Sequence, residues 1–473
     1  MASGIKIFWN CASILTGNFL NKIISIVVLI YLTGYLSPAE FGRYSFAISY
    51  IAFFGIFTDM GLNTLITREI SGGSIDASLG FGHAIIIRFI LSVSTAAVSI
   101  LSLYAMGYPV EVLGITAAAS LSLFLSFRGL FFRTVFDVPF QVNLKMSYPS
   151  AINFLNEILT FGLIVLLIKQ NVSLLGLVLA INLVNIPGFV AIIYFSSKVI
   201  RPRFSIDLTM WKKIFTEALP LGGAVLLEGI FIIIPIFILS RLATEEALGL
   251  YSLPFRLVSS LWIIPVALMI SLFPKISRDA LRSEDLVKEG FLKGLKMVLL
   301  IGVPIAVLTD YYSSNIIDTF TRGRYMGSAP ALSLMIWGTL IYFVNTVFFY
   351  IFTAAGRQKM NTIVWCVVSG VSVMLCALLI PGQLHMGAAM GFVGSLGAGL
   401  LLNIFLGYRV LGINVVPVLS KFLLSGLLTL TVLFFLPFLP EVSVILSLSA
   451  YLSILFFIRA VSIKEWGEWL NGK

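Results

Sequence analysis

The stretch Asn18–Ser45, NFLNKIISIVVLIYLTGYLSPAEFGRYS, decides the fold class of this chain. Its first part is an apolar run of the length that crosses a ~30 Å hydrocarbon layer as an α-helix, about 20 residues. The run contains Lys22, and a charged side chain among lipid tails is costly unless it faces a protein interior or a watery cavity. A turn around Ser37-Pro38 then leads into a second apolar run. We therefore expect two consecutive membrane-spanning helices, the first with a polar inner face.

The composition extends this pattern to all 473 residues. Hydrophobic residues make up 59% of the chain and charged residues only 11%, with a mean hydropathy of +1.04, whereas soluble proteins carry about 25% charged residues. The apolar runs are too long and too continuous for barrel strands, which alternate and span in about ten residues. The sequence therefore predicts an all-α polytopic membrane protein. We expect about 14 transmembrane helices, at residues 12–36, 42–66, 80–106, 112–135, 147–168, 174–196, 215–240, 248–272, 291–312, 330–354, 362–381, 388–409, 418–437 and 442–460.

The formal net charge of +10 follows the positive-inside pattern, so it does not indicate nucleic-acid binding. With a cytoplasmic N-terminus, 23 of the 31 Lys and Arg residues fall in cytoplasmic connections and ends. An even number of helices then places both termini in the cytoplasm. The exceptions are Arg43, Lys169, Arg241, Arg322 and Arg324 in outer connections, and Lys22, Arg88 and Arg256 inside helices.

An internal repeat divides the chain. Gly42-x-Tyr44-Ser45 recurs 207 positions later as Gly249-x-Tyr251-Ser252. We therefore expect two six-helix lobes, at residues 1–200 and 214–410, joined by a basic cytoplasmic linker at 201–213. Residues 411–473 hold two additional transmembrane helices and a short cytoplasmic tail. Parallel repeats of this kind are one plan of membrane transporters, in which the substrate path runs between the lobes.

Polar residues inside the predicted helices fall on single faces, and such faces line an interior or a watery cavity. Helix one carries Asn18, Lys22 and Ser25 at i, i+4 and i+7, and helix five repeats that spacing from Asn153 to Thr160. The candidates for a substrate cavity are Lys22, Arg88, Arg256, Asn18, Asn21, Asn153 and Asn156. The acidic residues Asp59, Glu157 and Glu228 are candidates for counter-ions to these cations or for proton or sodium sites, and the sequence leaves both roles open.

Three arginines near the cytoplasmic ends of helices admit an interpretation other than ligand binding. Arg88 lies near the cytoplasmic end of its helix, where a long side chain also reaches the interface by snorkelling. Arg128 and Arg133 lie at the cytoplasmic end of the fourth helix, where we expect a basic collar. Neither interpretation changes the predicted fold.

Several function classes find no support in the sequence. A nucleotide-binding Walker pattern is absent, and Cys11, Cys366, Cys376, His83 and His385 have no metal-ligand or redox spacing. No nucleophile triad is recognisable. We therefore expect no catalytic residues, no metal and no cofactor, and a protein that is not an enzyme.

Several segments resemble one transporter family. They are helix one with Asn18 and Lys22, the turn Tyr35–Tyr44, the segment Asp59–Asn63 with Arg68-Glu69, Lys145–Tyr148 and Ala354–Arg357. Together they resemble the polysaccharide transporters, the O-antigen-flippase-like branch of the multidrug/oligosaccharidyl-lipid/polysaccharide exporter superfamily. The resemblance covers essentially the whole chain and implies two lobes like those of the multidrug and toxic compound extrusion (MATE) transporters.

The resemblance also implies a function. Such a protein is a flippase in the plasma (inner) membrane, which moves a polyprenyl-diphosphate-linked oligosaccharide from the cytoplasmic to the outer leaflet by alternating access, for cell-surface polysaccharide biosynthesis. Lys22, Arg88 and Arg256 would hold the diphosphate in a cationic central cavity. Its partners would be the lipid-linked glycan, membrane lipid, polysaccharide assembly proteins and coupled H⁺ or Na⁺.

Two alternatives remain at this point. A multidrug or cation exporter of the same superfamily needs an acidic cavity, which Asp59, Glu157 and Glu228 would provide, although the cations inside the helices argue against it. A membrane-embedded glycan polymerase usually presents a large outer loop, and the connections here are short.

Overall fold

The structure is a computed structural model that describes residues 2–280, 282–435, 440–458 and 460. Within these residues, side chains are not described at 2–15, 18, 213, 219–222, 224, 284, 434 and 440–443. The described backbone is helical with short connections and contains no strand, and ten of its helices are long and apolar enough to cross a membrane. The predicted all-α polytopic class is confirmed, whereas the count of fourteen remains a prediction.

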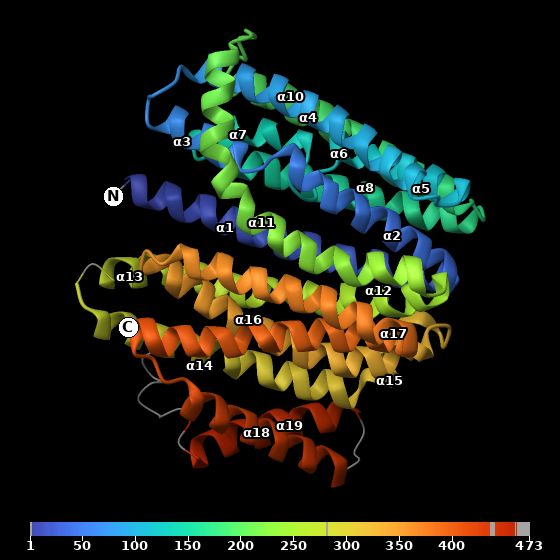
Figure 1. The fold of residues 1–473 in the computed structure, drawn as a ribbon, viewed down its shortest axis with the longest axis vertical. Coiled ribbons are helices and arrows are strands. Elements are labelled where there is room, and N and C mark those ends of the chain that lie inside the picture. The colour runs from blue at the N-terminus through green and yellow to red at the C-terminus, as the bar shows by residue number, and fades with distance from the viewer. Residues whose placement is uncertain (1, 281, 436–439, 459, 461–473) are drawn as a thin grey trace. The chain divides into compact units, whose positions relative to one another are not determined.

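Contacts divide the chain into two compact units, Met1–Ser252 and Leu253–Lys473. The first unit (Figure 1, blue to green) contains α1 to α11 and the first half of α12. Its helices are α1 (Ala2–Tyr35), α2 (Pro38–Gly55), the 3₁₀ turn η1 (Ile56–Thr58), α3 (Leu62–Ser71), α4 (Ala77–Ala105), α5 (Val110–Ser120), α6 (Ser122–Leu125), the 3₁₀ turn η2 (Phe132–Asp137), α7 (Val138–Val142), α8 (Ser147–Lys169), α9 (Leu174–Leu183), α10 (Ile186–Val199), α11 (Leu208–Leu242) and α12 (Glu245–Ser260).

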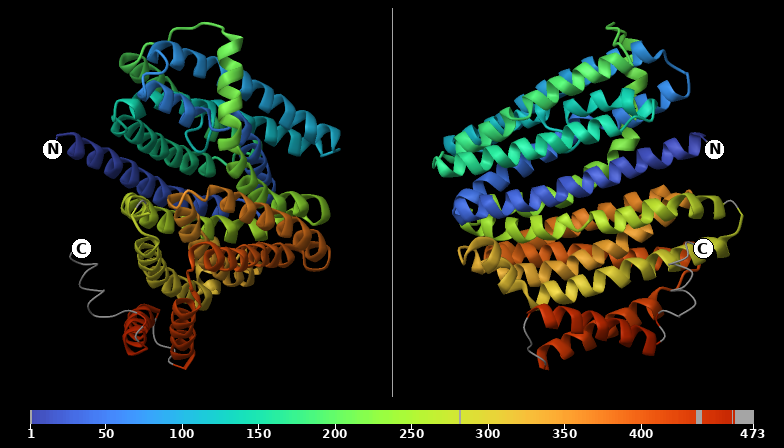
Figure 2. Two further views of the ribbon diagram at one scale, coloured as in Figure 1. Left: turned by 60° about the vertical axis from the view of Figure 1, so that its left-hand side comes forward. Right: turned by 180° about the vertical axis from the view of Figure 1, so that it is seen from behind.

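The second unit begins with the second half of α12 and contains long helices, which run alongside one another in the right-hand view of Figure 2 (yellow to red). They are α13 (Ile263–Asp279), α14 (Glu284–Tyr311), α15 (Ser313–Thr321), the 3₁₀ turn η3 (Met326–Ser328), α16 (Ala329–Ala354), α17 (Gln358–Leu411), α18 (Val416–Phe435) and α19 (Pro440–Phe457). A kink at Leu384 (φ 48°, ψ −125°) breaks α17 between the predicted spans 362–381 and 388–409.

The boundary between the units differs from the predicted boundary between the lobes. Helix α11, which the sequence assigns to the lobe at 214–410, packs against α2 and α3 within the first unit. The repeat boundaries therefore describe the duplicated sequence rather than the contact units, and they remain a prediction.

The turn around Ser37-Pro38 has the geometry of a capped helix start. The Ser37 hydroxyl accepts a hydrogen bond from the Glu40 backbone N–H at 3.3 Å, and the Glu40 carboxylate accepts one from the Ser37 N–H at 2.9 Å. Pro38, at the first helical position, has no N–H to satisfy. This capping box fixes where α2 begins.

Two spans of the first unit are broken partway through. The second span is interrupted after η1, where Met60 and Gly61 adopt positive φ values of 44° and 88°. The fourth span was expected as one helix at 112–135, but α6 ends at Leu125 and the chain is irregular up to Phe131, with Gly129 at φ 99°. The expectation of a continuous fourth helix is therefore wrong.

Arg88 stabilises both helix breaks by hydrogen bonds to their carbonyl groups. Its Nε donates to the Thr58 carbonyl at 3.2 Å, and its Nη2 donates to the carbonyls of Leu130 and Phe131 at 2.8 and 2.6 Å. A broken helix leaves carbonyl oxygens unpaired, which is costly away from water unless another group satisfies them. One guanidinium from α4 supplies donors to both breaks.

Asp59 completes this arrangement. Its Oδ1 lies 3.4 Å from Arg88 Nη1, and its carboxylate accepts the backbone N–H groups of Gly61 and Asn63. The Arg88 side chain is fully buried. The prediction that Arg88 lines a substrate cavity is therefore corrected: in this structure Arg88 is a buried structural residue, and Asp59 is its counter-ion.

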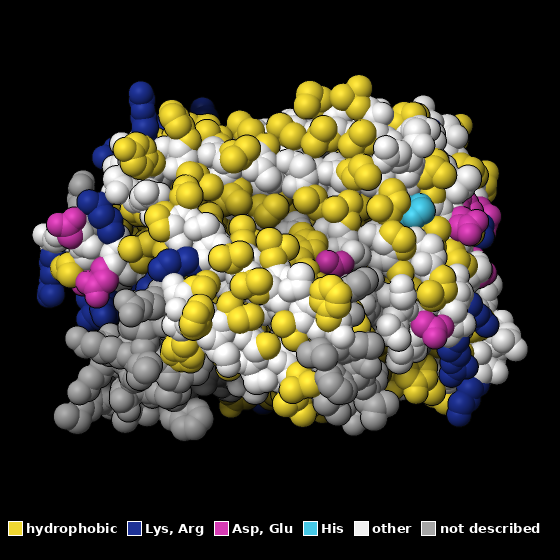
Figure 3. Space-filling model, turned by 90° about the horizontal axis from the view of Figure 1, so that it is seen from below, with side chains coloured by type: hydrophobic (Ala, Val, Ile, Leu, Met, Phe, Trp, Pro, Cys, Tyr) yellow, Lys and Arg dark blue, Asp and Glu magenta, His cyan; other side chains and the backbone are white. Residues whose placement is uncertain are grey.

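Apolar packing surrounds the breaks and covers the exterior. Phe81, Phe132, Phe136 and Phe140 belong to one buried cluster in the first unit, which packs η2 against α4, and α7 against η2 and α3. On the face drawn in Figure 3, hydrophobic side chains cover the middle and most charged side chains gather toward the two ends. That distribution suits a surface in contact with lipid tails, flanked by two polar interfaces.

Candidate functional site

The candidate site lies where α1, α8 and the broken fourth span meet in the first unit. Helix α1 runs along α8, and their contacts include Tyr31 against Phe161, with ring centroids 5.4 Å apart. The Tyr35 hydroxyl donates to the Val172 carbonyl at 2.8 Å beyond the end of α8. This packing holds one face of α1 against the face of α8 that carries Glu157.

Glu157 is the buried centre of the site. Its carboxylate accepts a hydrogen bond from the Ser25 hydroxyl of α1 at 3.1 Å and one from Arg128 Nε at 3.1 Å, and Arg128 Nη2 forms an ion pair with its other oxygen. A fork-to-fork pair of this kind is among the strongest protein hydrogen-bond arrangements. The carboxylate is therefore neutralised where water is excluded.

The two partners differ sharply in exposure. The Glu157 side chain is 1% exposed, whereas the Arg128 side chain is 42% exposed. The buried carboxylate of Glu157 thus holds Arg128 in place on one side, while part of the Arg128 guanidinium remains exposed. A fixed, half-exposed guanidinium suits binding of a phosphate or carboxylate group.

A second arginine, Arg133, lies in η2, directly after the irregular segment that carries Arg128. Arg133 Nη2 donates to Asn153 Oδ1 of α8 at 2.7 Å, and Arg133 itself is buried. Both arginines stack on Phe127, with guanidinium carbons 5.7 Å (Arg128) and 5.2 Å (Arg133) from its ring centroid. The predicted cavity residue Asn153 therefore orients Arg133 in this structure.

The polar face of α1 has fewer described contacts at this site. Lys22 and Asn21 are partly buried, and the Asn21 side-chain oxygen finds no hydrogen-bond partner among the described residues. The side chain of Asn18 lies outside the described ones. Their assignment to a substrate site stays a prediction.

Asn156 is placed differently from the prediction. It is 2% exposed, and its amide donates to Asn185 Oδ1 at 2.6 Å, next to Gly188 of α10. This contact joins α8 to the segment leading into α10. Asn156 is therefore a buried packing residue rather than part of an open cavity.

The remaining candidates lie away from this cluster along the chain. Glu228 is partly buried on α11, and Arg256 is partly buried on α12 in the second unit. Among the described residues no cluster of His, Cys, Asp or Glu has the arrangement of a metal site.

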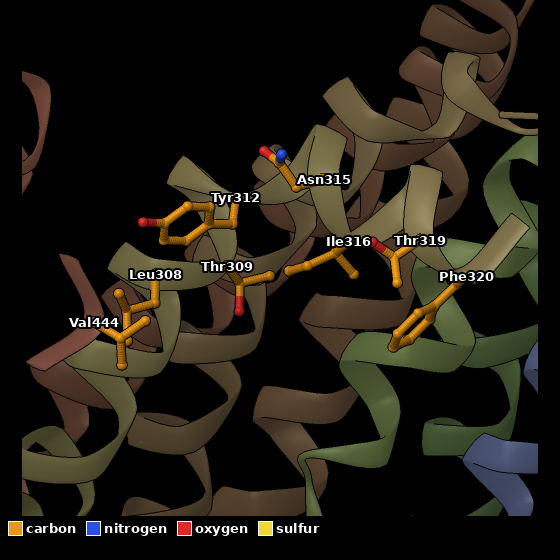
Figure 4. A pocket seen from close by; sticks show the side chains of 8 residues that line it. All are labelled: Leu308, Thr309, Tyr312, Asn315, Ile316, Thr319, Phe320 and Val444. Carbon is orange, nitrogen blue, oxygen red and sulfur yellow. The ribbon is translucent and has the colours of Figure 1, made fainter. Parts of the chain in front are cut away.

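The second unit has a pocket of its own (Figure 4). About 430 Å³ in volume, it lies between α14, α15 and Val444 of α19, and its lining includes Leu308, Ile316 and Phe320. No lining side chain is charged. The pocket therefore lacks the groups that hold an ionic ligand, in contrast to the Arg128 cluster.

Arg128 was not predicted as a site residue, because a continuous fourth helix would place it at the membrane edge. The available signal was the pair Arg128-Gly129 inside an apolar run, since a glycine beside a charge marks a local break. What the sequence did not show is that this break faces Glu157.

Sequence comparisons agree with this architecture. The profile of a family described as polysaccharide biosynthesis protein matches residues 7–280, and that of the MatE family matches residues 220–378. The putative O-antigen transporter of Shigella flexneri is 21% identical over 375 residues, which cover 76% of this chain and 86% of that protein. The teichuronic acid biosynthesis protein TuaB of Bacillus subtilis is 24% identical over 41% of this chain and 40% of its own length. The match to the membrane protein MJ1068 of Methanocaldococcus jannaschii spans 23% of that protein.

Solved structures agree on the fold. The lipid II flippase MurJ in an inward closed conformation superimposes with a TM-score of 0.79 at 16% identity, over 94% of this chain and 98% of that one. An inward-facing multidrug resistance MATE transporter gives a TM-score of 0.62 at 15% identity, over 83% and 94%. The first profile covers more than half of the chain. The resemblance to the polysaccharide transporters is therefore confirmed, and the chain belongs to the polysaccharide biosynthesis protein family.

Proposed function

We propose that the protein is a flippase for a polyprenyl-diphosphate-linked oligosaccharide, which it moves from the cytoplasmic to the outer leaflet of the plasma membrane. Both termini would lie in the cytoplasm, as the distribution of Lys and Arg predicts. Family membership supports a polysaccharide transporter. The substrate class rests on the charge of the site.

The half-exposed Arg128 carries this proposal. A diphosphate brings about two negative charges into the membrane, and a cation fixed at that depth offsets their loss of hydration. Arg128 is held by the buried Glu157, so it stays in place when no substrate is bound. Its guanidinium geometry matches phosphate oxygens.

Lys22 and Arg256 are proposed as further contacts to the diphosphate. Each is a cation inside a spanning helix, and each is only partly buried. The amides of Asn18 and Asn21 are proposed to contact the glycan, because amide groups both donate to and accept from sugar hydroxyls. Arg88 and Asn156 are left out of this set because both are buried in structural contacts.

The direction of transport agrees with the membrane field. Moving a negative charge outward across an inside-negative membrane releases about 2.3 kcal/mol per 100 mV. Two diphosphate charges would therefore favour the outward direction without ATP. Coupling to H⁺ or Na⁺, with Glu157 or Glu228 as the ion-binding carboxylate, would add to this driving force.

The cation exporter is the competing candidate, favoured by the MatE profile over residues 220–378. It requires acidic side chains free to meet a cationic drug. Asp59 and Glu157 are instead both paired with arginines, Arg88 and Arg128. This pairing argues for an anionic substrate.

Reconstitution tests the proposal. Purified protein in liposomes with a lipid-linked oligosaccharide is expected to expose the glycan on the opposite leaflet, measured by its accessibility to a glycan-cleaving enzyme. Arg128→Ala and the double variant Lys22→Ala/Arg256→Ala should each lose most of this exchange. Arg201→Ala, at an exposed position of the linker, is the matched control and should retain it. Exchange at the unmodified level in both cation variants would show that these residues do not hold the diphosphate.

A further inference from the structure

The connection between α10 and α11 begins with a non-helical strap, residues 201–207, which is bound to the first turns of α4. The Arg203 backbone N–H donates to the Ser78 carbonyl at 2.9 Å. A Cβ added to Gly82 would lie 2.1 Å from the Arg203 carbonyl oxygen, so a side chain at position 82 would collide with the strap. The strap therefore follows a fixed path along α4.

Side-chain hydrogen bonds hold the strap on the same helix. His83 of α4 is 2% exposed, and its Nε2 lies 3.1 Å from Ser205 Oγ. Its Nδ1 accepts a hydrogen bond from Trp211 Nε1 of α11 at 3.0 Å. Because an indole N–H only donates, Nδ1 carries no proton, and in the neutral ring Nε2 donates to Ser205. Ser205 therefore faces α4.

Three large apolar side chains around Ser205 face away from the protein. Phe204 is 63% exposed, Ile206 75% and Leu208 71%. Alternate side chains of an extended chain point to opposite sides, which places these three on the side opposite Ser205. We call them the apolar stripe. An exposed apolar patch rimmed by polar residues marks a surface that contacts a membrane or another protein.

Cations flank the apolar stripe. Arg201 and Arg203 precede it and Lys212 follows it in α11, and all three are exposed. Within the part of the chain that the structure describes, none of the three forms an ion pair. The carboxylate of Asp207 is engaged in capping α11, where it accepts the N–H groups of the next turn. Apolar side chains beside unpaired cations complement an anionic lipid surface.

The depth of the strap favours lipid over a cytoplasmic protein as the partner. Ser78 and Gly82, which the strap contacts, belong to the helix Ala77–Ala105, which is long and apolar enough to cross a membrane. The strap therefore runs beside the end of a spanning segment, at the level where acyl chains meet headgroups. Side chains that leave the protein surface at this level meet lipid.

We propose that the strap is a binding surface for anionic phospholipid, with the apolar stripe among the acyl chains and Arg201 and Arg203 at the phosphates. Attachment to α4 fixes the strap in advance, so binding orders little further backbone. In the predicted orientation the lipid belongs to the cytoplasmic leaflet, whose anionic headgroups attract basic segments. The bound lipid would tether the start of α11 to the membrane surface. This inference does not depend on the transported substrate.

Fluorescence quenching tests the contact. In protein with Cys11, Cys366 and Cys376 replaced by serine, Ile206→Cys carries an environment-sensitive fluorophore, in nanodiscs of phosphatidylcholine and phosphatidylglycerol. Ser74→Cys, at an exposed position between α3 and α4, is the matched control. The label at position 206 should be quenched by nitroxide on the acyl chains. It should also lose most of the quenching by aqueous acrylamide that the label at position 74 shows.

A charge-matched pair of variants tests the role of the arginines. Arg201→Gln/Arg203→Gln should reduce acyl-chain quenching of the label at position 206. Lys145→Gln/Lys275→Gln removes the same charge at two other exposed positions and should leave this quenching unchanged.

Two results would overturn the proposal. Equal acrylamide quenching at positions 206 and 74, without quenching by the lipid nitroxide, would assign the apolar stripe to a cytoplasmic protein instead. Acyl-chain quenching that is the same in pure phosphatidylcholine and in the Arg201→Gln/Arg203→Gln variant would overturn the preference for anionic lipid. Failure of glycan exchange in protein with the expected quenching would leave the lipid contact standing and count only against the proposed flippase function.

Discussion

Arg88 and Arg128 have different roles because one side chain is fully buried and the other is partly exposed. The Arg88 side chain is 0% exposed and donates to carbonyls freed by two broken helices. The Arg128 side chain is 42% exposed and is anchored on one side by Glu157. The first arrangement leaves no surface for a ligand, whereas the second leaves part of a fixed cation accessible. We therefore expect changes at Arg88 and its counter-ion to lower stability, and changes at Arg128 to lower transport as well.

Removing the counter-ion of Arg88 should destabilise the protein. Asp59→Asn keeps the size of the side chain but leaves a buried charge without its ion pair, which costs about 3–5 kcal/mol. Thermal unfolding in detergent, followed by tryptophan fluorescence, should show a clearly lower transition temperature. Glu217→Gln is the control, because the Arg68–Glu217 pair is exposed. Equal transition temperatures for the two variants would contradict the structural role of Arg88.

Glu157 and Arg128 allow stability to be separated from transport. Arg128→Ala leaves a buried carboxylate unpaired and should lower both stability and glycan exchange. The double variant Arg128→Ala/Glu157→Gln removes the charge and should recover stability, measured by the same unfolding assay. Glycan exchange should stay low in the double variant, because the cation itself is missing. Recovery of both properties together would mean that Arg128 only neutralises Glu157.

At the scale of helices, the sequence predicted the features that depend only on the residues of each apolar run, namely helical structure and burial in lipid. Hydropathy located the spans, since burial in lipid is a property of the segment itself. The breaks near Gly61 and Gly129 were not predicted, because they persist only with donors supplied by Arg88 from another helix. The same limit applied to the site: helical spacing grouped Asn153, Asn156 and Glu157 on one face, but only packing shows that Asn156 turns to Asn185 while Glu157 meets Arg128.

The break in the fourth span should depend on Gly129. At φ 99° a residue with a Cβ is strained, at a cost of about 1–3 kcal/mol. Gly129→Ala should therefore lower the unfolding temperature and, by displacing Arg128, the rate of glycan exchange. Gly114→Ala lies in the helical part of the same span with open space around the added carbon, so it should leave both values unchanged or raise stability slightly. A neutral Gly129→Ala variant would show that the irregular conformation is not required.

At the scale of the whole molecule, the internal duplication places the same turn at two positions of the chain, around Gly42 and around Gly249. Gly42 and Gly249 are repeat equivalents that touch, and Ser45 and Ser252 share the same burial. Two copies of one hairpin can form a reciprocal contact that a single copy cannot. The sequence revealed the repeat, but it did not show that the two copies face each other.

Transport of a diphosphate should respond to membrane potential. If two negative charges cross completely, 100 mV contributes about 4.6 kcal/mol, which shifts the leaflet ratio at equilibrium by roughly three orders of magnitude. Liposomes with a potassium diffusion potential set by valinomycin provide the measurement. Glycan should accumulate on the positive side, and reversal of the potential should reverse the accumulation. One monovalent cation that moves with the substrate would halve the effect, and two would abolish it. An exchange that ignores voltage but follows an imposed H⁺ or Na⁺ gradient would instead assign the driving force to ion coupling.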